Sequence, residues 1–296
     1  MTISEFYSKF PTEASCRLHL KTAREEAGIV CKKCDCTKHY WLKGKEQWQC
    51  SSCNFRTTLR SGTLFEASKL KLKTWFEALY LMSNNKKGMS ASELQRQLGL
   101  KRNEPAWYMS QKIRKAMQSI NEKTILTDEI EMDDGFFTVI HDPSTNLESK
   151  RGRGSSKQKV LVMVESMAPT DGTHKGLCGK LRMIALPALD QGEIWEVEDR
   201  LLQNTTKIRT DGFRGYNILD PQKHEPNAVP SKTAHKILPW VHTVIGNAKR
   251  LTNGIYHHIS QKFAQLYLDE FSFKFNHRYN NTRWNVVFQE GLSFNW

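Results

Sequence analysis

Apolar residues recur at helical spacing in the first half of the chain. One stripe consists of Leu72, Trp75, Phe76, Leu79 and Tyr80. Spacings of three and four residues place such side chains on one face of a helix. The stripe therefore predicts an amphipathic helix over residues 70–82 that packs inward. The polar run from Asn84 to Gly88 ends it.

Two further helical patterns follow within a few residues of each other. Ser90 and Glu93 have the spacing of a capping box and open a short helix that Gly99 closes. Pro105 suits the first turn of the next helix. The apolar stripe of that helix is Ala106, Met109, Ile113, Ala116, Met117 and Ile120. Two helices joined by a short turn containing glycine form a helix-turn-helix pattern.

The second of these helices also carries polar and basic residues. The candidate DNA-binding set is Tyr108, Gln111, Lys112, Arg114 and Lys115. Side chains of these types contact phosphates and base edges when their helix lies in a major groove. An ordinary solvated helix face gives the same pattern, so the DNA-reading interpretation gains its weight from the neighbouring features.

From residue 125 the pattern changes to short β-rich runs mixed with helices. The predicted strands are 125–140, 160–164, 181–186 and 207–210, and the predicted helices are 194–202, 240–251 and 261–275. Strands mixed with helices imply an α/β layer domain.

Four cysteines have the spacing of a zinc ribbon. The hooks Cys31–Cys34 and Cys50–Cys53 are each of the form CxxC and stand fifteen residues apart. Four thiolates at this spacing complete a tetrahedral zinc site, and disulfides or unrelated thiols are the alternative. A ribbon of about 25 residues buries too little apolar surface to fold without the metal. Cys36 and His39 lie inside it and are interpreted as bystanders. The predicted zinc ligands are Cys31, Cys34, Cys50 and Cys53.

These patterns predict a multidomain chain. It would comprise an N-terminal helical segment (1–24), a small zinc ribbon (25–60), a helix-turn-helix DNA-binding domain (61–124) and an α/β domain (125–296).

The positive charge is concentrated in the first half. Residues 1–124 hold 23 Lys and Arg against 11 Asp and Glu, whereas the rest of the chain holds 21 against 20. A basic region beside a zinc ribbon favours nucleic acid over membrane lipid as the partner. We recognise no signal peptide and no apolar run of membrane-spanning length, and the cysteines outside the ribbon form no paired pattern. We expect a cytoplasmic protein associated with the DNA of the nucleoid.

Two carboxylates stand where strands meet loops. Asp133 lies in the run Glu131-Met-Asp-Asp-Gly135, and Asp211 lies in Arg209-Thr-Asp-Gly-Phe-Arg-Gly-Tyr216. Alternation along the first strand puts Glu131 and Asp133 on one face with Asp134 opposite. Periodicity alone leaves either aspartate as a candidate, and Asp-Gly is also a common turn signal.

A resemblance to a known family adds to this interpretation. Its N-terminal part rests on Ser61-Gly-Thr-Leu-Phe65, Gly88-Met-Ser-Ala91, Leu98-Gly99 and Ala106-Trp107. Its C-terminal part rests on Asp133, the run Thr210–Tyr216, His242-Thr-Val-Ile-Gly-Asn-Ala-Lys249, Tyr267-Leu-Asp-Glu-Phe271 and Asn276-His-Arg278. In motif order over nearly the whole chain, these segments resemble zinc-ribbon insertion-sequence transposases, a group related to the Merlin transposases.

The resemblance implies an RNase H-like catalytic domain with a DDE-type metal site. Carried over by position, Asp133, Asp211 and Asn247 would be the ligands of Mg²⁺ or Mn²⁺, with Asn247 in place of the usual third acid. A subgroup of the family has Asn followed two residues later by Lys, as in Asn247 and Lys249. Lys249 would contact phosphate, and both residues join the two aspartates in the predicted catalytic set.

Helix geometry qualifies this assignment. If Val241, Val244, Ile245, Ala248 and Leu251 are the buried stripe of their helix, then Asn247 and Lys249 flank it on opposite sides. Arg250, three residues beyond Asn247, is better placed to accompany it and is a further candidate for DNA contact.

Glu270 projects from within an apolar stripe of the last predicted helix. A carboxylate there needs a partner, and Lys274 lies one turn on. We expect an ion pair with a structural role and keep a supplementary catalytic acid as the alternative.

The function predicted from the sequence is that of a DNA transposase. It would bind terminal inverted repeats as a homo-oligomer on double-stranded DNA, then cleave and join strands. One alternative is a domesticated DNA-binding regulator with an inactive nuclease-like domain. Another is a junction-specific or RNase H-type nuclease, which needs little base readout.

Overall fold

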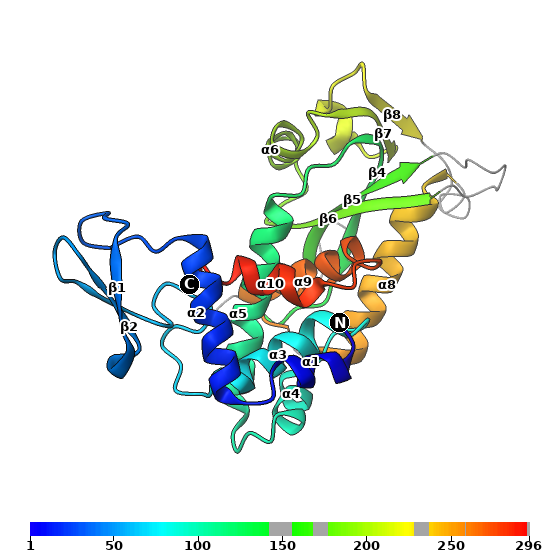
Figure 1. Ribbon diagram of the computed structural model, residues 1–296. Coiled ribbons are helices and arrows are strands. Elements are labelled where there is room, and N and C mark those ends of the chain that lie inside the picture. The colour runs from blue at the N-terminus through cyan, green and yellow to red at the C-terminus, as the bar shows by residue number, and fades with distance from the viewer. Residues whose placement is uncertain (142–155, 168–176, 228–236, 258, 295–296) are drawn as a thin grey trace. The chain divides into compact units, whose positions relative to one another are not determined.

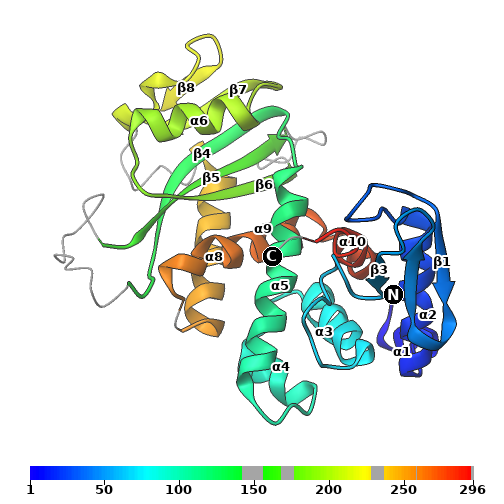
Figure 2. The same ribbon diagram turned by 90° about the vertical axis from the view of Figure 1, so that its left-hand side faces the viewer.

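The structure is a computed structural model that describes residues 1–141, 156–167, 177–227, 237–257 and 259–294. It divides into two compact units (Figures 1 and 2). One unit comprises Met1–Ala116 with Tyr279–Trp296, and the other comprises Met117–Arg278. Among the described helices, none combines the length and the apolarity needed to cross a bilayer.

The first unit joins a small sheet to a set of helices. Its helices are α1 (Ile3–Lys9), α2 (Glu13–Ala27), α3 (Leu72–Asn84), α4 (Ala91–Gln97), the first part of α5 (Asn103–Glu122) and α10 (Arg283–Glu290). Its strands are β1 (His39–Leu42), β2 (Gln47–Cys50) and β3 (Arg56–Thr58), and the 3₁₀ turn η1 (Lys43–Lys45) joins the first two. The strands form an antiparallel sheet in the order β1-β2-β3.

The predicted helices of this unit are present. Ser90 caps α4 by accepting a hydrogen bond from the backbone N–H of Glu93 at 3.1 Å. Gly99 follows α4 with φ of +61°, the left-handed conformation that glycine adopts without steric cost. The inward stripe of α5 is buried as predicted at Ala106, Met109, Ile113, Ala116 and Met117.

Helix α10 packs against α3, about 200 residues earlier in the sequence. Trp284 stacks on Phe288 with ring centroids 4.9 Å apart, and its indole N–H donates to the carbonyl of Phe76 at 3.3 Å. The backbone N–H of Leu64 donates to the carbonyl of Gly291 at 2.8 Å. The sequence assigned these C-terminal residues to a domain spanning 125–296, whereas their packing in the structure joins them to the first unit.

The second unit is built on a mixed five-stranded sheet. Its strands are β4 (Asp128–Phe137), β5 (Gln158–Met167), β6 (Leu177–Leu186), β7 (Thr205–Asp211) and β8 (His224–Asn227), in the order β6-β5-β4-β7-β8. β5 is antiparallel to β4 and β6, while β7 is parallel to β4 and β8. The predicted α/β layer domain is confirmed. β8, with the sequence His-Glu-Pro-Asn, has no apolar alternation and was not predicted.

Helices cover both faces of this sheet. They are α6 (Gln191–Leu201), α8 (Pro239–Ile255) and α9 (Ala264–Asn276), with the 3₁₀ turns η3 (Arg214–Ile218) and η4 (Gln261–Phe263). One core cluster joins Ile130 and Met132 of β4 to α6, and the other joins Phe137 to α8 and α9. Figure 2 shows α6 and α8 on opposite sides of the strands. Alternate residues of β4 therefore face different helices.

Glu270 of α9 has the partner that the sequence predicted. Lys274 Nζ donates to Glu270 Oε1 at 2.6 Å, and Tyr256 Oη donates to Glu270 Oε2 at 2.9 Å. Both members of the ion pair are buried. These two bonds satisfy both carboxylate oxygens inside the core.

Candidate metal centres

The four ribbon cysteines come together in the first unit. The Sγ atoms of Cys31 and Cys53 are 3.5 Å apart, those of Cys34 and Cys50 are 3.6 Å apart, and those of Cys34 and Cys53 are 3.3 Å apart. Zn–S bonds of about 2.3 Å in a tetrahedron set the sulfurs about 3.8 Å apart. The donor set and its dimensions thus fit one zinc ion.

Both hooks share one backbone geometry. The carbonyl of Cys31 accepts from the N–H of Asp35 at 2.9 Å, and the carbonyl of Cys50 accepts from the N–H of Asn54 at 3.1 Å. Asp35 and Asn54 have φ of 54° and 59°. Asp and Asn tolerate this left-handed conformation better than most residues, so each CxxC is followed by a residue that suits its turn.

The other thiols lie outside this group. Cys36 Sγ contacts the carbonyl of Lys38 at 3.7 Å, and His39 Nδ1 contacts the carbonyl of Thr37 at 3.1 Å. Among the described residues, the four-sulfur cluster includes neither Cys36 nor His39. All seven cysteines are free of disulfides.

The second centre lies where β4 and β7 run side by side. These strands are parallel, and their register pairs Glu131 with Arg209. Continuing that register by two residues sets Asp133 beside Asp211 on the face of the sheet that α8 covers. The observed carboxylates agree, because oxygens of Asp133, Asp134 and Asp211 lie within 4.8 Å of one another.

Local hydrogen bonds orient two of these carboxylates. Asp133 Oδ1 accepts from the backbone N–H of Asp134 at 2.8 Å, and Asp211 Oδ1 accepts from the backbone N–H of Phe213 at 3.0 Å. Asp133 is buried, whereas Asp134 and Asp211 are partly exposed. Oxygen-rich, partly accessible clusters of this kind suit Mg²⁺ or Mn²⁺.

Helix α8 runs along β4 beside this centre. His242 Nδ1 lies 3.4 Å from Asp133 Oδ2. The side chain of Ile245 lies beside Gly135, and Lys249 Nζ lies 5.8 Å from the centre of the Phe137 ring. Positions 242, 245 and 249 share one helix face. That face meets β4 at residues 133, 135 and 137 in turn.

Burial and nearby charges act on the pKa of the Lys249 amine. Burial lowers the pKa of its amine, and Lys157 lowers it further, whereas Asp133 and Asp134 oppose the shift. The amine therefore lies near the carboxylates of Asp133 and Asp134.

Asn247 has a different environment. Its side chain is exposed, and its Oδ1 accepts a hydrogen bond from Arg250 Nη2 at 2.9 Å. The pairing of Asn247 with Arg250 that helix geometry predicted is confirmed. At about 100° per residue, Asn247 lies roughly 140° around the helix from His242. The structure thus brings Asp133 and Asp211 together and turns the amide of Asn247 to another side of α8.

Glu131 caps the first turn of α8. Its Oε2 accepts from the backbone N–H groups of Trp240 at 2.8 Å and Val241 at 2.9 Å. Burial raises the pKa of this carboxyl, opposed by those two N–H groups and by Ser166 and Arg209. Sequence alternation put Glu131 on the same face as Asp133. Its partner lies about 110 residues away, so its capping role was missed.

Helix α5 buries three of its five predicted DNA-binding residues. Gln111, Lys112 and Arg114 are at most 8% exposed. Lys112 Nζ donates to the carbonyl of Glu66 at 2.8 Å. These three side chains are therefore not offered to a DNA groove. The other two differ, since Tyr108 is exposed and Lys115 is half-buried.

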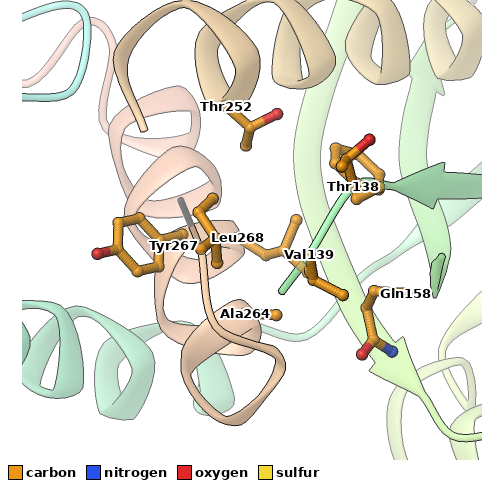
Figure 3. Close-up of a pocket in the computed structure, with 9 residues that line it drawn as sticks. Thr138, Val139, Gln158, Thr252, Ala264, Tyr267 and Leu268 are labelled. Carbon is orange, nitrogen blue, oxygen red and sulfur yellow. The ribbon is translucent and has the colours of Figure 1, made fainter. Parts of the chain in front are cut away.

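A cavity lies elsewhere in the second unit, between the end of β4, α8 and α9 (Figure 3). Val139, Thr252 and Leu268 are among the residues around it. It measures about 10 Å³, room for one water molecule, and its lining is largely apolar. It does not include the three aspartates.

We predict that the ribbon needs its zinc to fold. Replacing Cys50 by Ser removes one ligand of a module too small to fold alone, so bound zinc and the protection of β1–β3 against hydrogen exchange should both fall. Zinc content and exchange measured by mass spectrometry check this. Cys36→Ser is the matched control and should keep both. Equal loss in the two variants would reject the four-cysteine site.

We predict that Glu131 fixes α8 as a hydrogen-bond acceptor. Glu131→Ala leaves one buried and one partly buried N–H group without their acceptor and should lower the free energy of unfolding by about 1–3 kcal/mol. Glu131→Gln keeps an acceptor oxygen and should lose less. Urea denaturation at neutral pH measures both. Glu129→Ala, which removes a partly exposed contact to Arg209, is the control and should cost about 0–1 kcal/mol.

A pH series extends that test. A carboxyl whose folded pKa is raised favours the fold most when protonated. The contribution of Glu131 is therefore full at acid pH and declines as pH rises through its folded pKa. Glu131→Gln should remove that decline. A variant that keeps the wild-type pH profile would contradict the assignment.

Two family models match the chain. The ISXO2-like transposase domain matches residues 125–276, and the transposase zinc-ribbon domain matches residues 11–56. No curated protein and no solved structure matches it. The first match spans the sheet with its three aspartates, and the second includes all four ribbon cysteines. The first match covers more than half of the chain, and the second match places a transposase zinc ribbon before it. The chain therefore belongs to the ISXO2-like transposases.

Proposed function

We propose that the chain is the transposase of an insertion sequence. It binds the terminal inverted repeats of its element and catalyses cleavage and transfer of DNA strands with Mg²⁺ or Mn²⁺. The observation that carries the proposal is the meeting of Asp133 and Asp211 on adjacent parallel strands of a transposase-family domain. A mixed sheet covered by helices on both faces supports an RNase H-like catalytic domain.

The chemistry explains why carboxylates are needed. Bound divalent cations activate a water or a 3′-hydroxyl and stabilise the leaving oxygen of the phosphodiester. Asp133 and Asp211 would hold these cations, and Lys249 would contact the phosphate. The family resemblance gives the third position to Asn247. Since its amide bonds to Arg250 on the exposed side of α8, the proposal rests on the two aspartates, and Arg250 is assigned to DNA contact.

DNA recognition is assigned to the first unit. We propose that α4 and α5 act as a helix-turn-helix. Recognition helices contact bases through their N-terminal residues, and Lys101, Arg102 and Tyr108 are exposed at that end of α5. These three residues take the place of the buried Gln111, Lys112 and Arg114. The ribbon adds a second DNA contact. Pairing of two element ends calls for at least two copies of the chain on the nucleoid DNA.

Cleavage is tested on an oligonucleotide that carries the element's own inverted repeat. Asp133→Ala and Asp211→Ala should each lower the Mg²⁺-dependent rate by about a thousandfold, since a metal site supplies several kcal/mol of transition-state stabilisation. End binding should persist. Asp199→Ala changes an exposed carboxylate on α6, which covers the other face of the sheet, and should cleave normally.

The results of that assay distinguish the transposase from its alternatives. Cleavage retained in both aspartate variants would reject the proposed ligands. Wild-type protein that binds the repeat in Mg²⁺ and in Mn²⁺ but cleaves in neither would favour the DNA-binding regulator over the transposase. Cleavage of branched DNA without preference for the repeat would favour the structure-selective nuclease.

The helix-turn-helix assignment has its own test. Arg102→Ala should weaken binding to the repeat and reduce the slope of log affinity against log salt by about one, if the guanidinium neutralises one phosphate. Gel-shift titrations over a salt series measure both. Lys262→Ala removes an exposed charge outside the first unit and is the control. An Arg102 variant indistinguishable from this control would remove Arg102 from the interface.

A further inference from the structure

We propose that His242 is the protein ligand that α8 supplies to the catalytic site. In this assignment His242 and Asp133 together hold one divalent cation, while Asp133 and Asp211 hold the other. The inference rests on the proposed function and names a residue to which the family resemblance gives no role.

Distance is the first argument. His242 Nδ1 lies 3.4 Å from Asp133 Oδ2. Two neighbouring ligands of an octahedral cation with bonds of about 2.1 Å lie about 3.0 Å apart. The observed pair is therefore close to the spacing that a shared cation imposes. Among the described residues, the cluster within 4.8 Å comprises the three aspartates and does not include His242. The contact of His242 in this centre is with Asp133, so the cation assigned to His242 is one that Asp133 shares.

The face of α8 is the second argument. His242, Ile245 and Lys249 follow β4 at Asp133, Gly135 and Phe137. His242 and Lys249 are seven residues apart, so they differ by only about 20° around the helix. The imidazole and the amine therefore lie along one side of the helix, the side that faces the strand carrying Asp133.

The anchoring of the first turn of α8 is the third argument. Glu131, two residues before Asp133, binds the backbone N–H groups of Trp240 and Val241, which come directly before His242. The strand therefore holds α8 at the residue next to the imidazole. Asn247, by contrast, is hydrogen-bonded to Arg250 on its own helix.

The donor set makes a chemical prediction. Mg²⁺ takes oxygen ligands almost exclusively, whereas imidazole suits transition-metal ions better. A site with one imidazole should therefore favour Mn²⁺ over Mg²⁺ more strongly than an all-oxygen site does. His242→Asp supplies an oxygen ligand instead and should shift that preference toward Mg²⁺.

Manganese binding tests the assignment without relying on activity. Free Mn²⁺ is followed by electron paramagnetic resonance during titration of the zinc-loaded full chain bound to the inverted-repeat oligonucleotide. His242→Ala should weaken one binding step by about ten- to a hundredfold, of the order seen when an interaction at a metal site is lost. Asn247→Ala is the matched control from the same helix and should stay within about twofold of wild type.

Cleavage rates give a second measurement. The ratio of the rate in Mn²⁺ to the rate in Mg²⁺ should fall in His242→Asp relative to wild type and stay unchanged in Asn247→Asp. Circular dichroism and thermal melting confirm that each variant is folded. His242→Gln is a second variant that approximately preserves the size of the side chain. Because His242 is partly exposed, the change should leave the fold intact.

The outcomes separate this inference from the function on which it rests. Weakened Mn²⁺ binding in Asn247→Ala, with normal binding in His242→Ala, would overturn the role of His242 and restore Asn247. Normal binding in both variants would also overturn it. If Asp133→Ala and Asp211→Ala bind Mn²⁺ normally as well, the proposed metal site itself fails.

Discussion

The alignment of α8 with β4 is the contact on which the second unit depends. Glu131 binds the first turn of the helix, and His242, Ile245 and Lys249 then meet the strand at successive positions of one face. A strand side chain returns to the same face every second residue, and a helix side chain returns every third or fourth. Once Glu131 fixes the first turn of α8, the strand and helix periodicities together determine which helix residues face the aspartates.

The residues of the site differ in what fixes their positions. Asp133 and Asp211 belong to neighbouring parallel strands, so the backbone ladder fixes their spacing. The helix residues have no such ladder. They depend on Glu131 and on apolar packing of Val241, Val244 and Ala248 against the sheet. Loss of these contacts would let α8 rotate, and a different helix residue would then face Asp133.

Local patterns in the sequence were sufficient for most elements of the fold. The stripe from Leu72 to Tyr80, the cap at Ser90 and the four strands with apolar runs all depend on neighbours in the chain. The pairing of α10 with α3 and the cap that Glu131 places on α8 depend on residues that are far apart in sequence. Local periodicity carries no information about such contacts.

The candidate sites divide in the same way. The meeting of the four ribbon cysteines follows from CxxC spacing, because each hook is closed by its own local turn. The two aspartates follow from motif order, whereas their proximity depends on the parallel register of β4 and β7, which the sequence does not reveal. The outward face of α5 could not be assigned from residue type, since long polar side chains such as Lys112 and Arg114 also bury their stems and bond to nearby oxygens. Charge alone does not identify the exposed side of a helix.

His242 and Asn247 show that two positions of one motif can lie on different sides of a helix. A motif fixes order along the chain, but a helix of 100° per residue distributes neighbouring positions around its whole circumference. Five residues separate the two, which places them on different sides of α8, whereas seven residues return from His242 to Lys249. Lys249 is the reference point, since its amine lies 5.8 Å from the centre of the Phe137 ring on the strand that carries Asp133. The helix residue that shares its face is His242, and the amide of Asn247 is instead joined to Arg250.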